Sequence, residues 1–254
     1  MRRSMLLLPT IFFGLGVGAL QAQESQKPAI SVASTGKATA KADLAIVFMT
    51  IHSSSPLAAD ALEQNNKKVQ AVRDRLTALG YKEDKVKFSG NRFAPAGGPG
   101  FYYGGGQRPT GFDVSNNVFV YIEGPELSDL QQFNSRASSL LDELSKLGAS
   151  PFEMPISRIS MGGSSVVAFT VKDPSAFEKQ AYQQAMEKSR PTADDIARRM
   201  KVQIIGIDSV TTMAEPRIQE QFANPLDEVP YRYLSSSLDE VPVRVSVTVR
   251  YSFK

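Results

Sequence analysis

The order in which the hydrophobic period changes along the chain is the feature that most constrains its fold. Alternating apolar and polar residues, typical of strands, give way three times to apolar residues at the three- and four-residue spacing of helices. The resulting order is β-β-α-β, β-α-β, α-β-β. A parallel doubly wound sheet would require strict alternation of single strands and helices. We therefore predict an α+β fold, in which two or three long amphipathic helices pack on one or two largely antiparallel sheets.

Three segments have the helical period. The first runs from Pro56 to Leu79 and the second from Glu126 to Leu147, and a glycine follows each. The third runs from 174 to 201 and contains Pro191, which removes a backbone donor and collides with the preceding turn, so we expect a kink or a split there. The similar lengths of helices that follow strand pairs suggest two related halves.

The remaining segments have the character of strands. They lie at 30–35, 44–53, 86–93, 112–122, 156–171, 202–213 and 241–253. The second of these is apolar on both faces, which is typical of a central strand, and residues 41–43 form a turn before it. The last, VPVRVSVTVRYSF, alternates so regularly that one face must be buried. Asn116 and Asn117 interrupt the middle of another strand, where we expect a bulge.

The first 22 residues predict export. Arg2 and Arg3 precede an apolar run from Met5 to Leu20, and Ala22 provides a small residue for cleavage, as in a secretory signal peptide. Cleavage after Ala19 is the alternative site. No second long apolar segment follows, so the mature chain, which we interpret as one domain over residues 23–254, should hold no transmembrane helix. We expect it in the periplasm and leave association with the outer membrane open.

Composition excludes several function classes. The chain has no cysteine, so disulfides, thiolate metal sites and thiol nucleophiles are excluded. The formal charge of +3 includes Arg2 and Arg3, and their removal leaves 27 basic and 26 acidic residues. A nearly neutral surface does not favour a nucleic-acid partner, which calls for a basic patch.

Catalytic and metal-binding groupings are weak in this sequence. His52 is the only histidine and is followed by three serines, so an envelope hydrolase that uses a serine near His52 is one alternative function. Asp194 and Asp195 lack the ligand spacing of a calcium site, and we expect them to favour the start of a helical segment after Pro191. We assign no catalytic, cofactor-binding or metal-binding residue and expect no cofactor.

Two loops have unusual compositions. The segment 94–111 combines glycines with aromatic residues but has no Gly-Lys-Ser/Thr and precedes a strand, so it is not interpreted as a phosphate-binding loop. The segment 214–240 contains Leu-Asp-Glu-Val-Pro twice and is interpreted as an inserted, exposed loop. The candidate interaction residues in these loops are Phe101, Tyr102, Tyr103, Tyr231 and Tyr233.

Four stretches together resemble one known family. They are ISVASTGKATAKADLAIVFMTI, LGYKEDKVKFSG, GFDVSNNVFVYIE and VRVSVTVRYSF, with Gly36, Ala40, Asp43 and Ala45 in register with the family pattern. The resemblance is to the SIMPL domain proteins, which include exported periplasmic immunogenic proteins of bacteria. The chain departs from the family in having Ala42 where proline is usual and in the proline of its third helix.

The resemblance implies an α+β fold, export to the periplasm, large ring-like oligomers in some members and a link to oxidative-stress tolerance. It implies no catalytic residues. We therefore expect a non-enzymatic protein of the cell envelope that forms homo-oligomers or contacts other envelope proteins through aromatic loops and sheet edges. The alternatives are the hydrolase described above and a small-ligand binding module.

Overall fold

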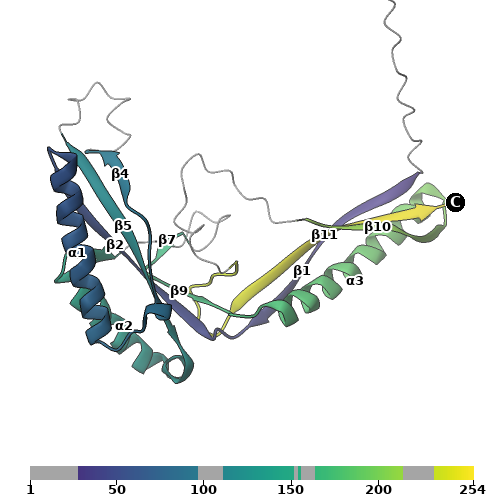
Figure 1. Ribbon diagram of the computed structural model, residues 1–254. Helices are drawn as coiled ribbons and strands as arrows, with labels where there is room; N and C mark the ends of the chain where they lie inside the picture. The colour runs from purple at the N-terminus through teal and green to yellow at the C-terminus, as the bar shows by residue number, and fades with distance from the viewer. Residues whose placement is uncertain (1–27, 97–110, 152–153, 156–163, 214–231) are drawn as a thin grey trace, which may run out of the picture.

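The computed structural model contains two antiparallel sheets, each covered by helices on one face (Figure 1). It describes residues 28–96, 111–151, 154–155, 164–213 and 232–254. The short strands β7 (Met154–Pro155) and β8 (Ser164–Ser165) form a separate pair. Helices combined with antiparallel sheets confirm the predicted α+β class.

The first sheet is built around two long strands. Its members are β2 (Leu44–Ser55), β3 (Val86–Phe88), β4 (Arg92–Pro95), β5 (Phe112–Glu123), β6 (Ala149–Pro151) and β9 (Val167–Thr170). β2 pairs with β5 along its whole length, from Leu44 opposite Glu123 to Ser55 opposite Phe112. β2 also pairs with β6 and β9, so it is central, as its apolar character on both faces predicts.

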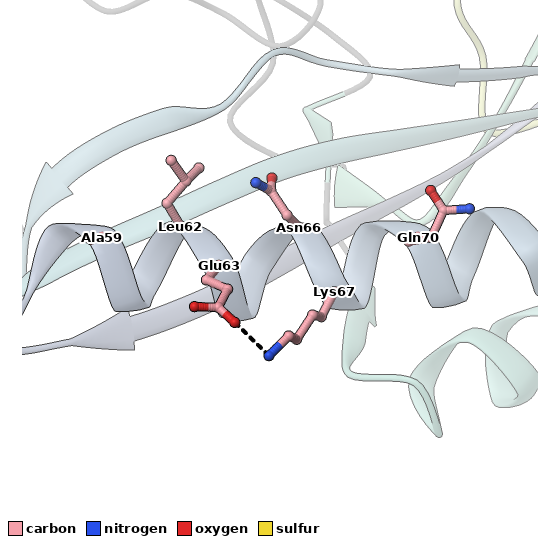
Figure 2. A pocket seen from close by; sticks show the side chains of 6 residues that line it. All are labelled: Ala59, Leu62, Glu63, Asn66, Lys67 and Gln70. Carbon is pink, nitrogen blue, oxygen red and sulfur yellow. Dashed lines mark ion pairs between the residues drawn. The ribbon is translucent and has the colours of Figure 1, made fainter.

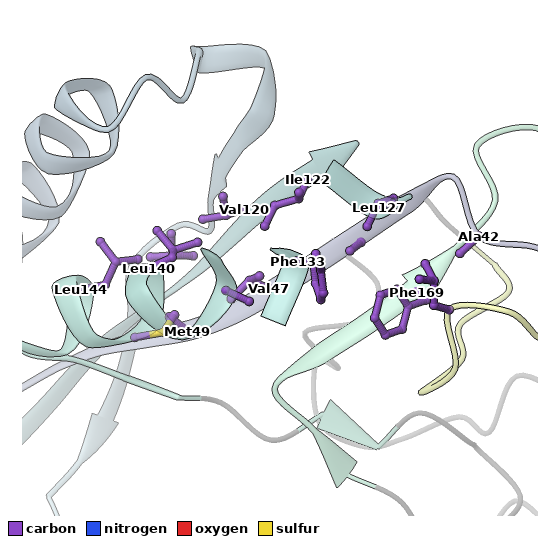
Figure 3. Close-up of a cluster of buried hydrophobic side chains, with 14 of the residues drawn as sticks. Ala42, Val47, Met49, Val120, Ile122, Leu127, Phe133, Leu140, Leu144 and Phe169 are labelled. Atoms are coloured by element: carbon purple, nitrogen blue, oxygen red, sulfur yellow. The ribbon is translucent and has the colours of Figure 1, made fainter. Parts of the chain in front are cut away.

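Two helices cover one face of the first sheet, α1 (Ala58–Ala78) and α2 (Leu130–Ser145) (Figure 1). Their buried positions follow the apolar spacing in the sequence: Ala61, Asn65, Val72 and Leu76 in α1, and Phe133, Ala137, Leu140 and Leu144 in α2. Figure 3 shows α2 side chains beside apolar side chains of β2, β5 and β9. This face holds the largest core of the molecule.

The ends of these helices are set by local residues. α2 begins later than predicted, because residues Gly124–Leu127 form a 3-10 turn and Asp129 then caps the helix. The Asp129 carboxylate accepts hydrogen bonds from the backbone N–H groups of Gln131 at 2.8 Å and Gln132 at 3.2 Å. Gly80 and Gly148 follow the two helices with φ of 87° and 85°, as expected of C-terminal glycines. A short 3-10 turn, Glu83–Lys85, follows α1.

β5 itself has no bulge at Asn116 and Asn117, because its pairing with β2 continues through both residues without a shift. On its other side the register shifts by one at these residues, where the pairing passes from β3 to β4. The side chains of the two asparagines are used in hydrogen bonds. The Asn116 amide donates to the carbonyl oxygen of Ser89 at 2.8 Å, and its side-chain oxygen accepts from the buried Asn65. The Asn117 side chain accepts from Thr50 at 3.2 Å. Partners on adjacent elements therefore satisfy these polar groups without an extra residue in the strand.

The second sheet has three strands in the order β1 (Ala29–Ala40), β11 (Val241–Phe253) and β10 (Ile204–Met213). One face of β11 is buried, as its alternation predicts: Val241, Val243, Val247, Val249 and Tyr251 lie in the core. Arg244 lies on the opposite face and is exposed. A long helix, α3 (Ser175–Met200), runs along the buried face (Figure 1).

Small residues allow α3 to lie very close to the sheet. Its buried positions recur every four residues: Ala181, Ala185, Ser189, Ala193 and Ala197. The approach is closest at Gly36 of β1, where a Cβ atom would lie 1.8 Å from the carbonyl oxygen of Ala181. The Ser34 hydroxyl also donates to the Ala185 carbonyl at 2.7 Å. Close backbone and hydroxyl contacts therefore join α3 to β1, beside the apolar cluster that Ile30 and Val32 form with the alanines of α3.

Pro191 does not split α3, which is one helix from Ser175 to Met200. We attribute the continuity to the small-residue stripe, which packs on the sheet both before and after the proline. Asp194 and Asp195 consequently lie inside the helix and not at the start of a second segment. They pair with arginines one turn away, Asp194 with Arg190 at 3.1 Å and Asp195 with Arg199 at 2.9 Å.

Residues 41–43 carry the chain from the second sheet to the first. β1 and β2 do not pair with each other, so this predicted turn is a link between sheets and not a hairpin. The backbone N–H of Ala42 donates to the carbonyl of Leu238 at 2.9 Å, and the Asp43 carboxylate accepts from the backbone N–H of Lys172 at 2.9 Å. The link is thus tied to the segments that enter α3 and β11.

An ion-pair cluster lies at the same junction. Glu123, the last residue of β5, pairs with Lys172 and with Lys85. Hydrogen bonds from these two ammonium groups, with Lys172 contributing most, lower the pKa of the Glu123 carboxyl. The carboxylate therefore stays charged at neutral pH and holds the end of β5 against the start of the α3 segment.

The described part of the predicted inserted loop is exposed at its charged residues and anchored to the body of the protein by buried ones. Residues 232–240 pack at the junction, where Tyr233 and Leu238 are buried. Ser235 exchanges two backbone hydrogen bonds with Phe169, at 2.8 and 2.9 Å. The charged residues Arg232, Asp239 and Glu240 are exposed, as the charge content predicts, while Tyr233 and Leu238 anchor the segment. Residues 214–231 lie outside the described part of the chain.

Candidate functional site

Of the five candidate aromatic residues, Tyr233 is the one that the structure describes; Phe101, Tyr102, Tyr103 and Tyr231 lie outside the described residues. Tyr233 lies at the junction of the two sheets. Its hydroxyl donates to the Glu178 carboxylate at 2.7 Å, and its carbonyl oxygen accepts from the Thr170 hydroxyl at 2.6 Å. The ring is thereby fixed between α3 and the end of β9.

A groove of about 460 Å³ lies beside Tyr233. Four separate segments line it: the first two turns of α3, the end of β10, the beginning of β11 and residues 232–233. The lining residues are Ser175, Glu178, Lys179, Tyr182, Thr212, Arg232, Tyr233 and Val245. Tyrosine and valine side chains supply apolar walls, and charged groups lie around them.

More cationic than anionic side chains line the groove. Lys179 and Arg232 are exposed cations, and the guanidinium of Arg232 lies 5.5 Å from the centre of the Tyr233 ring. Glu178 is the acidic residue of the lining, and it already accepts the Tyr233 hydroxyl. In the part of the chain that the structure describes, no carboxylate forms an ion pair with Lys179 or Arg232. The described lining of the groove therefore carries two cations and one carboxylate.

His52 contacts an aspartate on the neighbouring strand. Its Nε2 lies 3.4 Å from Asp113 Oδ1, and the imidazole is half exposed on the face of the first sheet opposite α1. Register places Ser115 opposite His52 and Ser54 opposite Asp113. Among the described residues no serine is hydrogen-bonded to the imidazole. The aspartate–histidine half of a hydrolytic triad is thus present without a positioned nucleophile.

The described residues contain no cluster of three or more histidine, cysteine, aspartate or glutamate side chains suited to a metal ion. Nor do they contain a helix of the length and apolar character required to span a bilayer.

A second hollow lies on the outer surface of α1 (Figure 2). Its lining is Ala59, Leu62, Glu63, Asn66, Lys67 and Gln70, all from this one helix. Glu63 and Lys67 form an ion pair at 2.6 Å, and the hydrogen bond from Lys67 lowers the pKa of the Glu63 carboxyl. Because no second element forms a wall, the hollow encloses no ligand.

The two edges of the second sheet differ in protection. At β1, the backbone N–H of Lys37 donates to the side chain of Gln184 at 2.7 Å, and the carbonyl of Thr35 accepts from Lys188 at 3.3 Å. α3 therefore covers this edge with two of its own side chains. At β10, Ile205 and Ile207 are 59% and 51% exposed. Within the described residues, β10 pairs on one side only, with β11.

A family model described as SIMPL, a protein of unknown function (DUF541), matches residues 30–251. The chain belongs to the SIMPL family. No curated protein matches it significantly.

Two of the residues that carry the SIMPL resemblance have structural roles in the fold. Gly36 permits the close approach of α3, and Asp43 ties the link between the sheets to Lys172. The groove of this SIMPL protein was not predicted, apart from Tyr233. Glu178 and Arg232 are more than fifty residues apart, and neither stands in a recognisable motif, so no local signal brings them together. In β10, apolar residues stand at both odd and even positions, so the two faces of the strand both carry them. This pattern is the sequence signal for its exposed isoleucines.

Proposed function

We propose that this SIMPL protein is exported to the periplasm and acts in the cell envelope by self-association and not by catalysis. Export is supported by the signal-like composition of residues 1–22. The link to stress tolerance that the family resemblance implies is part of the same proposal.

The edge of β10 is the observation that carries self-association. An unpaired strand edge presents a row of backbone donors and acceptors to which another strand can add. Soluble proteins commonly protect such edges with charged or covering side chains, as α3 does for β1 through Gln184 and Lys188. β10 has two register irregularities, between Ile204 and Gly206 and between Ile207 and Ser209, but it still exposes Ile205 and Ile207. Pairing with a second copy would bury both side chains and satisfy the edge.

Export predicts a defined new N-terminus. When the full chain is expressed in a bacterium with a periplasm, we expect the osmotic-shock fraction to contain protein that begins at Gln23. Intact mass of that protein is the measurement. Recovery of the chain from the cytoplasm with residues 1–22 attached would contradict export, and a start at Leu20 would move the cleavage site to Ala19 without affecting export.

If the protein self-associates through β10, replacing its two exposed isoleucines with lysine should dissociate the multimer. We expect residues 23–254 to form a discrete multimer by light scattering behind size exclusion. Ile205→Lys combined with Ile207→Lys should weaken assembly at least about tenfold, because charge and lost apolar burial both oppose pairing of the edges.

A matched control is available in the other sheet's helices. Leu57→Lys combined with Leu130→Lys places lysines at two exposed leucines, one directly before α1 and one at the start of α2, and all four side chains are between 50% and 63% exposed. The control should retain the multimer. A wild-type protein that is monomeric at every concentration would refute self-association. If both pairs of substitutions weaken the multimer equally, association through the β10 edge would be refuted.

The hydrolase alternative has weaker support. It rests on the contact between His52 and Asp113, and it lacks a serine bonded to the imidazole in the described part of the chain.

A further inference from the structure

The groove beside Tyr233 has the features of a preformed ligand site. Its volume of about 460 Å³ lies within the range usual for small-molecule sites. Tyr233 is held by hydrogen bonds at both its hydroxyl and its carbonyl. Residue 235 is in turn paired with Phe169 of the first sheet. The walls therefore need little ordering when a ligand binds, which favours affinity.

The chemistry of the lining selects the ligand. Tyr182 and Val245 offer an apolar surface to a ring or an aliphatic chain, and Thr212 adds a hydroxyl. Arg232 and Lys179 supply cationic donors, and a guanidinium binds a carboxylate through two parallel hydrogen bonds. Glu178 opposes ligands with several negative charges. Its acceptance of the Tyr233 hydroxyl keeps it directed toward that residue.

We propose that this groove binds a small organic monoanion: a carboxylate carried on an aromatic or aliphatic body. The carboxylate lies between Arg232 and Lys179, and the apolar body lies against Tyr182 and Val245. The site is separate from the β10 edge isoleucines, so the inference does not depend on self-association.

Phenylacetate is the probe for this site, titrated into the purified protein with binding followed by calorimetry or NMR. Phenylacetamide and phenethylamine share its ring but are neutral and cationic. We expect phenylacetate to bind at least about fivefold more tightly than phenylacetamide, since only the anion forms charge-assisted hydrogen bonds. Phenethylamine should bind most weakly. Equal binding of the three compounds, or no saturable binding of phenylacetate, would overturn the proposal.

Substitutions in the groove test which residues bind phenylacetate. Lys179→Gln combined with Arg232→Gln should weaken phenylacetate binding at least about fivefold, because both charge-assisted contacts are lost. Arg199→Gln, at the exposed far end of α3, should leave binding unchanged. Glu178→Gln keeps an acceptor for Tyr233 and removes the negative charge, so binding should become tighter.

The direction of the change in affinity for Glu178→Gln distinguishes a charge effect on the ligand from a purely structural role of Glu178. In a structural role, loss of the carboxylate would weaken binding or leave it unaltered. Unchanged affinity in the Lys179 and Arg232 double variant would place the ligand elsewhere and refute the proposal. Light scattering on the same samples reports self-association independently, so failure of either proposal is visible without the other.

Discussion

Gly36→Ala is expected to lower the free energy of unfolding by about 3 kcal/mol or more, at the upper end of the cost of overpacking a core. The added Cβ would lie 1.8 Å from the carbonyl oxygen of Ala181 and 2.7 Å from the backbone nitrogen of Ala185. Both atoms belong to the backbone of α3, so no side chain can rotate away and the helix itself must move. Urea unfolding followed by circular dichroism measures the loss.

Gly206→Ala is the matched control for this prediction. Gly206 lies in β10 of the same sheet, where the nearest atom to a new Cβ is the Ser252 hydroxyl oxygen at 3.8 Å, an ordinary contact. We expect it to change stability by less than about 1 kcal/mol, as is usual for substitutions without a clash. Equal stability of the two variants would show that α3 does not lie as close to β1 as described.

Phe133→Ala is expected to cost about 3 to 5 kcal/mol, the usual range for removing a buried phenylalanine side chain. Phe133 of α2 is 2% exposed and its ring centre lies 5.4 Å from that of Phe169. Figure 3 shows it between the helix and the first sheet. Its removal opens a cavity at the place where α2 docks on the sheet, and denaturant unfolding measures the effect.

Phe93→Ala tests whether burial is the cause. Phe93 of β4 is 52% exposed, so the same chemical change removes little buried surface and should cost less than about 1 kcal/mol. A small effect at both positions would contradict the packing of α2 on the sheet.

Local periodicity was sufficient for the main elements. The stripes of α1 and α2 and the alternation of β11 are properties of adjacent residues, and each element is found where its period predicts it. The predicted strand from Val86 to Phe93 is instead two strands. Ser89 lies between them, where its side chain accepts the backbone N–H of Asn117 at 2.6 Å. That bond depends on a residue 28 positions away, which a local pattern does not contain.

The expected split of the helix at Pro191 and the expected bulge in β5 at Asn116 are wrong for the same reason. Each prediction applied a correct local rule, and each was overridden by contacts from a distant segment: the sheet beneath α3 and the side chains of Asn65 and Ser89. A proline or an asparagine has an intrinsic preference of a few kcal/mol at most in such positions, so packing and hydrogen bonding can reverse it.

By itself the sequence determined the α+β class, the central position of β2, the buried face of β11 and the SIMPL resemblance, because hydrophobic period and short motifs are written in neighbouring residues. The tertiary structure alone decided that β1 and β2 enter different sheets, that α3 protects one sheet edge while β10 remains exposed, and that Glu178, Arg232 and Tyr233 line one groove. These features arise from contacts between segments far apart in the chain, and their positions depend on how the sheets and helices pack.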